Sequence, residues 1–118
     1  MTNILEQIIQ DKKESLNLIK KNNSLDALEE KIKNLNFYND FKKKIQSNKS
    51  VSLISEIKQA SPSAGILIKD FNHLNIAKMY IDNGATCLSV LTEEKHFLGK
   101  LDYITDIKNK FKIPVLAK

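Results

Sequence analysis

A glutamate and a lysine stand two residues apart at the end of an apolar stretch, as Glu56 and Lys58. Side chains alternate along a strand, so both groups project from the same face. A carboxylate beside an ammonium group positions the lysine and favours its protonated form. Such a lysine binds an anion or donates a proton, although a structural ion pair at a strand end has the same pattern.

A short loop of small residues follows, with Ser61, Pro62 and Ser63 and then Gly65. The serine hydroxyls can donate hydrogen bonds to an anion, proline stiffens the loop and glycine permits unusual backbone dihedrals. An ordinary turn uses the same residue types. The residues alone therefore leave an anion-binding loop and a simple turn as equal alternatives.

The segment Leu91–Gly99 offers a second group of side chains with chemical potential. Phe97 can form the wall of an apolar pocket, or it can anchor the loop in the core. His96 can transfer a proton, although a lone loop histidine is more often a solvated residue. Glu93 and Glu94 do not resemble a metal site, because no third hard ligand stands at a suitable spacing.

Lys118 follows the apolar stretch Ile113–Ala117, as Lys58 follows an earlier one. Two lysines from neighbouring strands are expected to converge on one anionic or carbonyl-bearing ligand. Taken from the sequence alone, an ordinary solvated lysine is the stronger interpretation of Lys118.

The elements that must position these residues alternate in type along the second half of the chain. Residues 51–58, 85–91 and 113–117 are rich in β-branched and apolar residues and predict strands, whereas 74–83 and 101–111 have helical spacing. Apolar strands separated by helices indicate a parallel sheet covered by helices. Ligands bind at the carboxyl ends of such strands, where these charged residues lie.

The first half of the chain predicts helices. Apolar residues recur every three to four positions from Ile4 to Ile19, and again from Leu25 to Leu35, with Ser24 as the N-cap of the second helix. A short third helix is expected around Phe41 and Ile45.

Composition excludes several classes of protein. The net charge is +5, but all 19 basic residues are lysine, so the arginine fork favoured for phosphate and guanine is missing and we expect no nucleic-acid partner. No stretch reaches the roughly 20 apolar residues that span a bilayer, so we expect no membrane partner. With one cysteine, Cys87, and no export signal, we expect a cytoplasmic protein without disulfides.

Three segments together resemble the indole-3-glycerol phosphate synthase family. They read LISEIKQASPSAG, DFNHLNIAKMYIDNGATCLSVLTEEKHFLGKLDYI and IPVLAK, and they combine the patterns E-x-K-x-x-S-P-S and L-T-E-E-K-x-F-x-G with a strand ending in lysine. The resemblance implies an α/β fold: the N-terminal portion of a (β/α)₈ TIM barrel, about three βα units, preceded by a helical extension. It places the extension at residues 1–50 and the first three strands at residues 51–118.

The resemblance also implies a reaction and a set of roles. The family closes an indole ring on 1-(2-carboxyphenylamino)-1-deoxyribulose 5-phosphate with release of CO₂ and water, in tryptophan biosynthesis, and it uses no cofactor or metal. Lys118 matches the general acid at the substrate carbonyl, Lys58 a lysine that contacts anionic groups, and Glu56 the carboxylate that orients them. The implied substrate-binding residues are Ser61, Pro62, Ser63 and Phe97.

Three strands cannot close an eight-stranded barrel. We therefore expect a fragment that is inactive alone, with the missing C-terminal part of the barrel as its partner. Two other functions stay open. Phosphoribosylanthranilate isomerase is another phosphosugar barrel enzyme, and a non-catalytic α/β interaction module would recruit a partner by strand pairing.

Overall fold

A computed structural model describes residues 3–118 of the chain. The chain divides between Tyr38 and Asn39 into two compact units, each of which has its own architecture.

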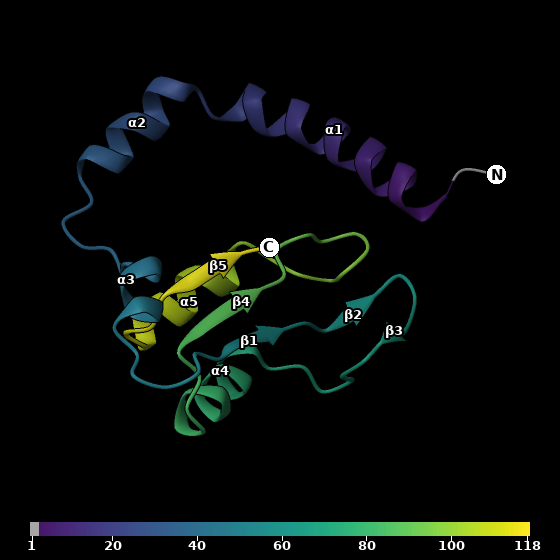
Figure 1. Cartoon of the computed structure of the whole chain (residues 1–118). Helices are drawn as coiled ribbons and strands as arrows, with labels where there is room; N and C mark the ends of the chain where they lie inside the picture. The colour runs from purple at the N-terminus through teal and green to yellow at the C-terminus, as the bar shows by residue number, and fades with distance from the viewer. Residues whose placement is uncertain (1–2) are drawn as a thin grey trace. The chain divides into compact units, whose positions relative to one another are not determined.

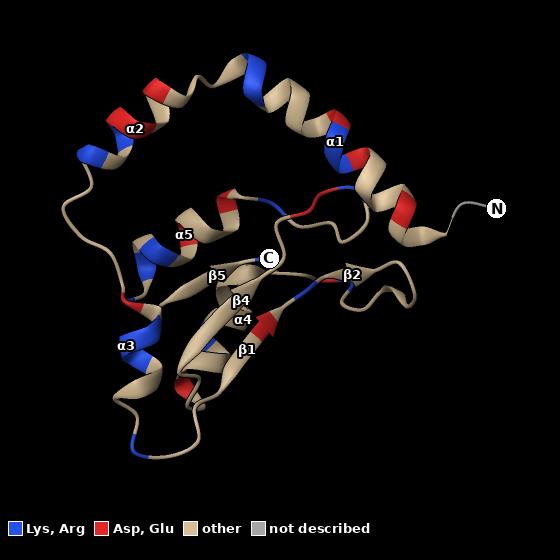
Figure 2. Cartoon of the chain, turned by 45° about the horizontal axis from the view of Figure 1, so that its top comes forward, with Lys and Arg blue, Asp and Glu red and all other residues tan. Residues whose placement is uncertain are grey.

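The first unit contains two amphipathic helices, α1 (Ile4–Asn22) and α2 (Leu25–Lys33). Helix α1 begins with a capping box, in which the Asn3 side chain accepts a hydrogen bond from the Glu6 N–H and the Glu6 carboxylate accepts one from the Asn3 N–H. Ser24 is the N-cap of α2, as predicted, and its hydroxyl accepts from the Ala27 N–H. Neither helix contains a buried residue. Figure 2 shows that both acidic and basic residues occur along the two helices.

The second unit is a three-stranded parallel sheet with helices between its strands (Figure 1). Its successive elements are α3 (Phe41–Gln46), β1 (Ile54–Ile57), β2 (Ala60–Ser61), β3 (Gly65–Ile66), α4 (His73–Asp82), β4 (Cys87–Val90), α5 (Asp102–Lys110) and β5 (Val115–Ala117). The strand order is β1-β4-β5, and both pairings are parallel. The predicted parallel sheet is confirmed. Helices α4 and α5 lie between its successive strands in the chain, and the β2–β3 hairpin adds two short strands that were not predicted.

One face of this sheet packs against α4 and α5. The buried apolar cluster combines residues from the strands with residues from both helices: Ile57, Ile76, Ala77, Leu88, Val90, Ile107 and Ile113. Ile107 and Leu88 are completely buried, and burial of a side chain of that size stabilises the fold by about 1.5–3 kcal/mol. The opposite face is more open, because Ile54 and Leu116 remain 46% and 48% exposed.

The predicted element boundaries differ from the observed ones in two ways. Each strand is shorter than its apolar stretch. Strand β1, for example, begins only at Ile54, and Val51 before it is 94% exposed. The hairpin β2–β3 lies within what the sequence indicates is a loop, because strands of two residues are too short to show an alternating pattern. Gly84 follows α4 with a φ of +93°, a left-handed conformation that suits the predicted glycine cap.

Polar groups join α3 to the amino ends of the strands. The Thr86 hydroxyl accepts hydrogen bonds from the Leu53 N–H at 3.0 Å and from the Asn48 amide at 3.4 Å. The Ser52 hydroxyl donates to the Ile45 carbonyl at 3.3 Å. These uncharged bonds fix the entry into β1 and β4.

Among residues 3–118, no helix is long and apolar enough to cross a membrane.

Candidate functional site

The charged residues meet on the sheet face that α4 and α5 leave open. The register aligns Glu56 with Ser89 and Ser89 with Leu116, so these three residues form one row across the sheet. Lys58 and Lys118 each lie two positions beyond this row, at the carboxyl ends of β1 and β5. In Figure 2 the tip of the β1 arrow is acidic and the segment that follows it is basic.

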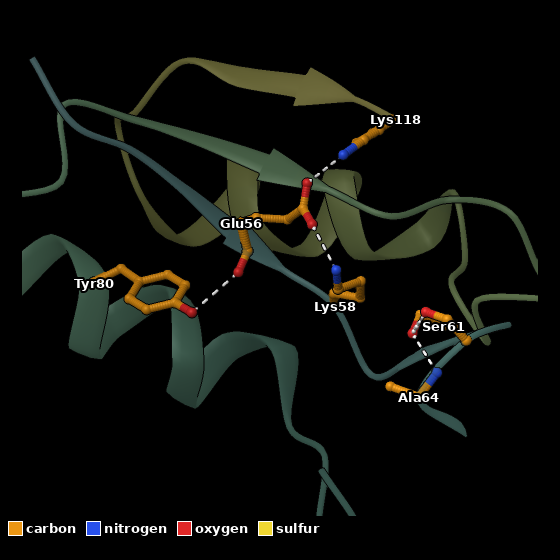
Figure 3. Close-up of polar contacts among 7 residues, drawn as sticks. Glu56, Lys58, Ser61, Ala64, Tyr80 and Lys118 are labelled. Atoms are coloured by element: carbon orange, nitrogen blue, oxygen red, sulfur yellow. Dashed lines mark hydrogen bonds and ion pairs between the residues drawn. The ribbon is translucent and has the colours of Figure 1, made fainter. Parts of the chain in front are cut away.

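Glu56 holds both lysines (Figure 3). Its Oε1 lies 3.3 Å from Lys58 Nζ, and its Oε2 accepts a hydrogen bond from Lys118 Nζ at 2.6 Å. The side chains of Glu56 and Lys58 are 29% and 34% exposed, and that of Lys118 is 55% exposed. The sequence favoured an ordinary solvated lysine at position 118. Lys118 is indeed 55% exposed, but its ammonium group also pairs with a carboxylate from β1, a contact that this interpretation did not include.

We expected the two lysines to come from neighbouring strands, and that expectation is wrong. Strand β4 lies between β1 and β5, and it presents the small side chain of Ser89 between Glu56 and Leu116. The lysines converge nevertheless, because the Glu56 carboxylate is reached by the long Lys118 side chain from across β4.

Hydrogen bonding lowers the pKa of Glu56 below its ordinary value of 4.5. The bond from Lys118 is the largest cause, burial opposes it, and the bond from Lys58 adds to it. Glu56 is therefore a carboxylate at neutral pH. Two ammonium groups oriented by a carboxylate at the open end of parallel strands can bind an anion and can donate a proton.

Tyr80 supports Glu56 from the helix side of the sheet. Its hydroxyl donates to the Glu56 main-chain carbonyl at 3.0 Å, in a partly buried position (Figure 3). Tyr80 was not among the predicted site residues, because its place in the helical pattern is that of an ordinary residue of α4. Its polar tip, which needs a partner when the ring is buried, was the available signal.

The serine loop forms the turn of the β2–β3 hairpin. The Ser61 hydroxyl accepts a hydrogen bond from the Ala64 N–H at 3.2 Å and lies 3.4 Å from the Ser63 hydroxyl. Gly65 adopts a φ of +67°, as its predicted conformational role requires. The turn around Pro62 therefore uses its own serines as local partners. This geometry fits the turn interpretation.

Phe97 and His96 belong to a loop that Glu93 organises. The Glu93 carboxylate accepts hydrogen bonds from the backbone N–H groups of Lys95, His96 and Phe97, at 3.1, 2.7 and 3.1 Å. Phe97 and His96 are both partly buried. The Phe97 N–H is thus bound within its own loop. Glu93 is thus bound to its own loop, and the described residues contain no cluster of three side chains suited to a metal.

Comparisons with known proteins identify relatives along the whole chain. Residues 5–118 match the family described as indole-3-glycerol phosphate synthase. A protein named indole-3-glycerol phosphate synthase from Legionella pneumophila (strain Lens) is 45% identical over 118 residues, which is 100% of this chain and 45% of that protein. A protein of the same name from Desulforamulus reducens is 43% identical over 115 residues, which is 98% of this chain and 43% of that protein.

A third protein of that name, from Aliarcobacter butzleri, is 44% identical over 118 residues, which is 98% of this chain and 45% of that protein. The chain thus spans less than half the length of the curated relatives it matches. The isomerase and the interaction module are not favoured by these matches.

Proposed function

The chain belongs to the indole-3-glycerol phosphate synthase family, and we propose that its lysine pair serves the ring-closing reaction of that family. One observation carries the proposal: Glu56 holds Lys58 and Lys118 together at the carboxyl ends of two parallel strands. The substrate would be an anionic phosphosugar joined to anthranilate, and cationic side chains suit its carboxylate and phosphate groups.

The proposed role of Lys118 is to donate a proton to the substrate's carbonyl oxygen as the new carbon–carbon bond forms. Loss of CO₂ and of water then completes the indole ring. Two features support this role. The Lys118 side chain is 55% exposed and accessible to a ligand, and the Glu56 carboxylate holds its ammonium group at 2.6 Å, in the position that a general acid requires.

The remaining roles follow the same scheme. Lys58 would bind the anionic groups of the substrate, and Glu56 would orient both lysines. Ser61 and Ser63 would donate their hydroxyl protons to the substrate carboxylate. The Ser61 oxygen accepts from the Ala64 N–H, and that bond does not use the Ser61 hydroxyl proton. Pro62 would hold this turn rigid, and Phe97 would pack against the anthranilate ring.

The proposal also includes the fold of the complete protein, its missing part and its cellular compartment. The three parallel strands would be the first three of a (β/α)₈ barrel, supplied by residues 51–118, with residues 1–50 as a helical extension. Helix α3 belongs to that extension in sequence, although it lies in the compact unit of the sheet. The rest of such a barrel is the partner that would complete the site. We place the chain in the cytoplasm, in keeping with its single, buried cysteine.

A chimera tests the proposal. Residues 1–118 are joined to the part of the Legionella pneumophila relative that follows its match to this chain, and formation of indole-3-glycerol phosphate is measured. We expect the chimera to turn over and Lys118→Met to reduce kcat by at least about 100-fold, since general acid catalysis contributes roughly 10²–10⁴-fold. The 118-residue chain, assayed alone in parallel, should be far slower than the chimera.

Lys112→Met is the matched control. Lys112 lies three positions before Val115, the first residue of β5, and so stands at the opposite end of this strand from Lys118. It should leave kcat unchanged. If the chimera that carries Lys118→Met folds and retains full activity, the proposed role of Lys118 is contradicted.

A further inference from the structure

The main chain of Lys118 is held on both sides by the end of β4. The Lys118 N–H donates to the Val90 carbonyl at 3.0 Å, and the Lys118 main-chain oxygen accepts from the Thr92 N–H at 2.8 Å. The Thr92 hydroxyl donates to that same oxygen, also at 2.8 Å. One residue thus provides two hydrogen bonds to a single atom of Lys118.

The Thr92 peptide is itself fixed by Gly99. A Cβ atom on Gly99 would lie 2.2 Å from the Leu91 main-chain oxygen and 2.9 Å from the Thr92 nitrogen, distances that real Cβ atoms do not show. The Gly99 N–H also donates to the Glu93 carbonyl at 2.8 Å. The loop therefore closes directly onto the peptide that holds Lys118, and only glycine permits that approach.

A long side chain needs such an anchor to keep its ammonium group in one place. Lys118 reaches Glu56 from a side chain that is 55% exposed, so surrounding side chains restrict it little. Fixing the main-chain end limits where Nζ can lie, and the Glu56 carboxylate fixes the other end. If the hydrogen bonds to the Lys118 main chain are lost, the Lys118 side chain gains conformational freedom, and ordering it against Glu56 then costs more conformational entropy.

We propose that Thr92 is a positioning residue for Lys118: its hydroxyl and N–H hold the Lys118 main-chain oxygen, and so set the Lys118 ammonium against Glu56. Thr92 is assigned a positioning role because its hydroxyl proton is donated to Lys118. The importance of this role for catalysis rests on the proposed function of Lys118. The effect of Thr92 on the position of the Lys118 ammonium group is independent of that function.

The test is a carboxyl titration that needs no turnover. The 118-residue chain is labelled with ¹³C at its glutamate side-chain carboxyls, the Glu56 signal is assigned by its absence in Glu56→Gln, and its pKa is followed by NMR. The bond from Lys118 is the largest cause of the lowered Glu56 pKa, so a displaced Lys118 raises it. We expect an upward shift in Thr92→Val and none in Thr92→Ser, which restores the hydroxyl.

Two further variants separate positioning from general damage to the fold. Gly99→Ala pushes on the Thr92 peptide without touching its hydroxyl, and it should also raise the Glu56 pKa. Thr86→Val removes a hydroxyl that accepts a backbone N–H at the other end of β4, and it should leave the Glu56 pKa unchanged.

An unchanged Glu56 pKa in Thr92→Val overturns the proposal, and so does an equal shift in Thr86→Val. If Thr92→Val does not fold, Thr92→Ala removes the hydroxyl with a smaller side chain and is judged by the same criterion. An inactive chimera would contradict the proposed function and leave this titration unaffected, so the two failures are distinguishable.

Discussion

The two ends of the parallel sheet are built from different kinds of interaction. At the amino end, uncharged groups bond to one another, and the central residue, Thr86, is only 7% exposed. At the carboxyl end, Glu56 bonds to Lys58 and Lys118, and all three side chains are between 29% and 55% exposed.

This difference separates stability from function within one small sheet. A partly buried N–H that loses its acceptor costs up to about 1–3 kcal/mol, whereas an exposed ion pair contributes only about 0–1 kcal/mol. The amino end therefore contributes more to folding per interaction. The carboxyl end holds charges accessible to a ligand, in the region where barrel enzymes bind their substrates.

The largest effect on folding should come from Thr86→Val. The substitution preserves shape but removes the oxygen that accepts the Leu53 N–H at 3.0 Å. We expect the free energy of unfolding to fall by about 1–3 kcal/mol in urea denaturation. Thr86→Ser is the control, because it keeps the hydroxyl and should recover most of the loss. If Thr86→Val left the free energy of unfolding unchanged, the amino end of the sheet would not be the end that stabilises the fold.

Tyr80→Phe tests whether position or chemical kind decides the cost. The Tyr80 hydroxyl forms an uncharged, partly buried bond to the Glu56 carbonyl, yet it lies at the charged end. We expect a loss of about 0.5–1.5 kcal/mol in the same urea denaturation. If Tyr80→Phe lost less free energy of unfolding than Glu56→Gln, the charged bonds would contribute more to folding than the uncharged one, contrary to the difference drawn between the two ends of the sheet.

Glu56→Gln should lower stability at pH 7 by about 0.5–1 kcal/mol, because its ion pairs are partly exposed. The pKa of Glu56 is lowered in the folded chain, so its contribution is present above the ordinary value of 4.5 and is lost as pH falls through the folded value. The difference between the parent chain and Glu56→Gln should therefore shrink on acidification. Urea denaturation at pH 7, 5 and 3 measures it, and a constant difference would contradict the cause given for the lowered pKa.

The sequence predicted the order of elements because each depends on a local pattern. Apolar stretches such as Ala85–Leu91 and the helical spacing before Gly84 are readable within a few residues. The hairpin β2–β3 was missed because its strands, Ala60–Ser61 and Gly65–Ile66, are too short for periodicity. The shortened β1 was missed because β-branched residues also occur in exposed extended chain, as at Val51.

The candidate site was predictable only where its residues are close in sequence. Glu56 and Lys58 are two positions apart, and alternation along a strand brings them together. The bond from Lys118 to Glu56 spans 62 positions and depends on strand order, which a local pattern does not contain. The hydrogen bonds from Thr92 to the Lys118 main-chain oxygen were not predicted for the same reason, since a threonine after a strand has no local signature of its partner.

The smallest effect on folding, and the sharpest test of the charged end, comes from comparing Lys118→Met with Lys58→Met. Each should change the free energy of unfolding by less than about 0.5–1 kcal/mol, because both lysines are substantially exposed. Both should raise the Glu56 pKa, and Lys118→Met should raise it further, since the bond at 2.6 Å is a larger cause of the lowered value than the contact at 3.3 Å. Carboxyl titration by NMR measures the order of the two shifts. If Lys58→Met gave the larger shift, the bond across β4 would be the weaker of the two, and the lysine from β5 would not be the one that Glu56 chiefly holds.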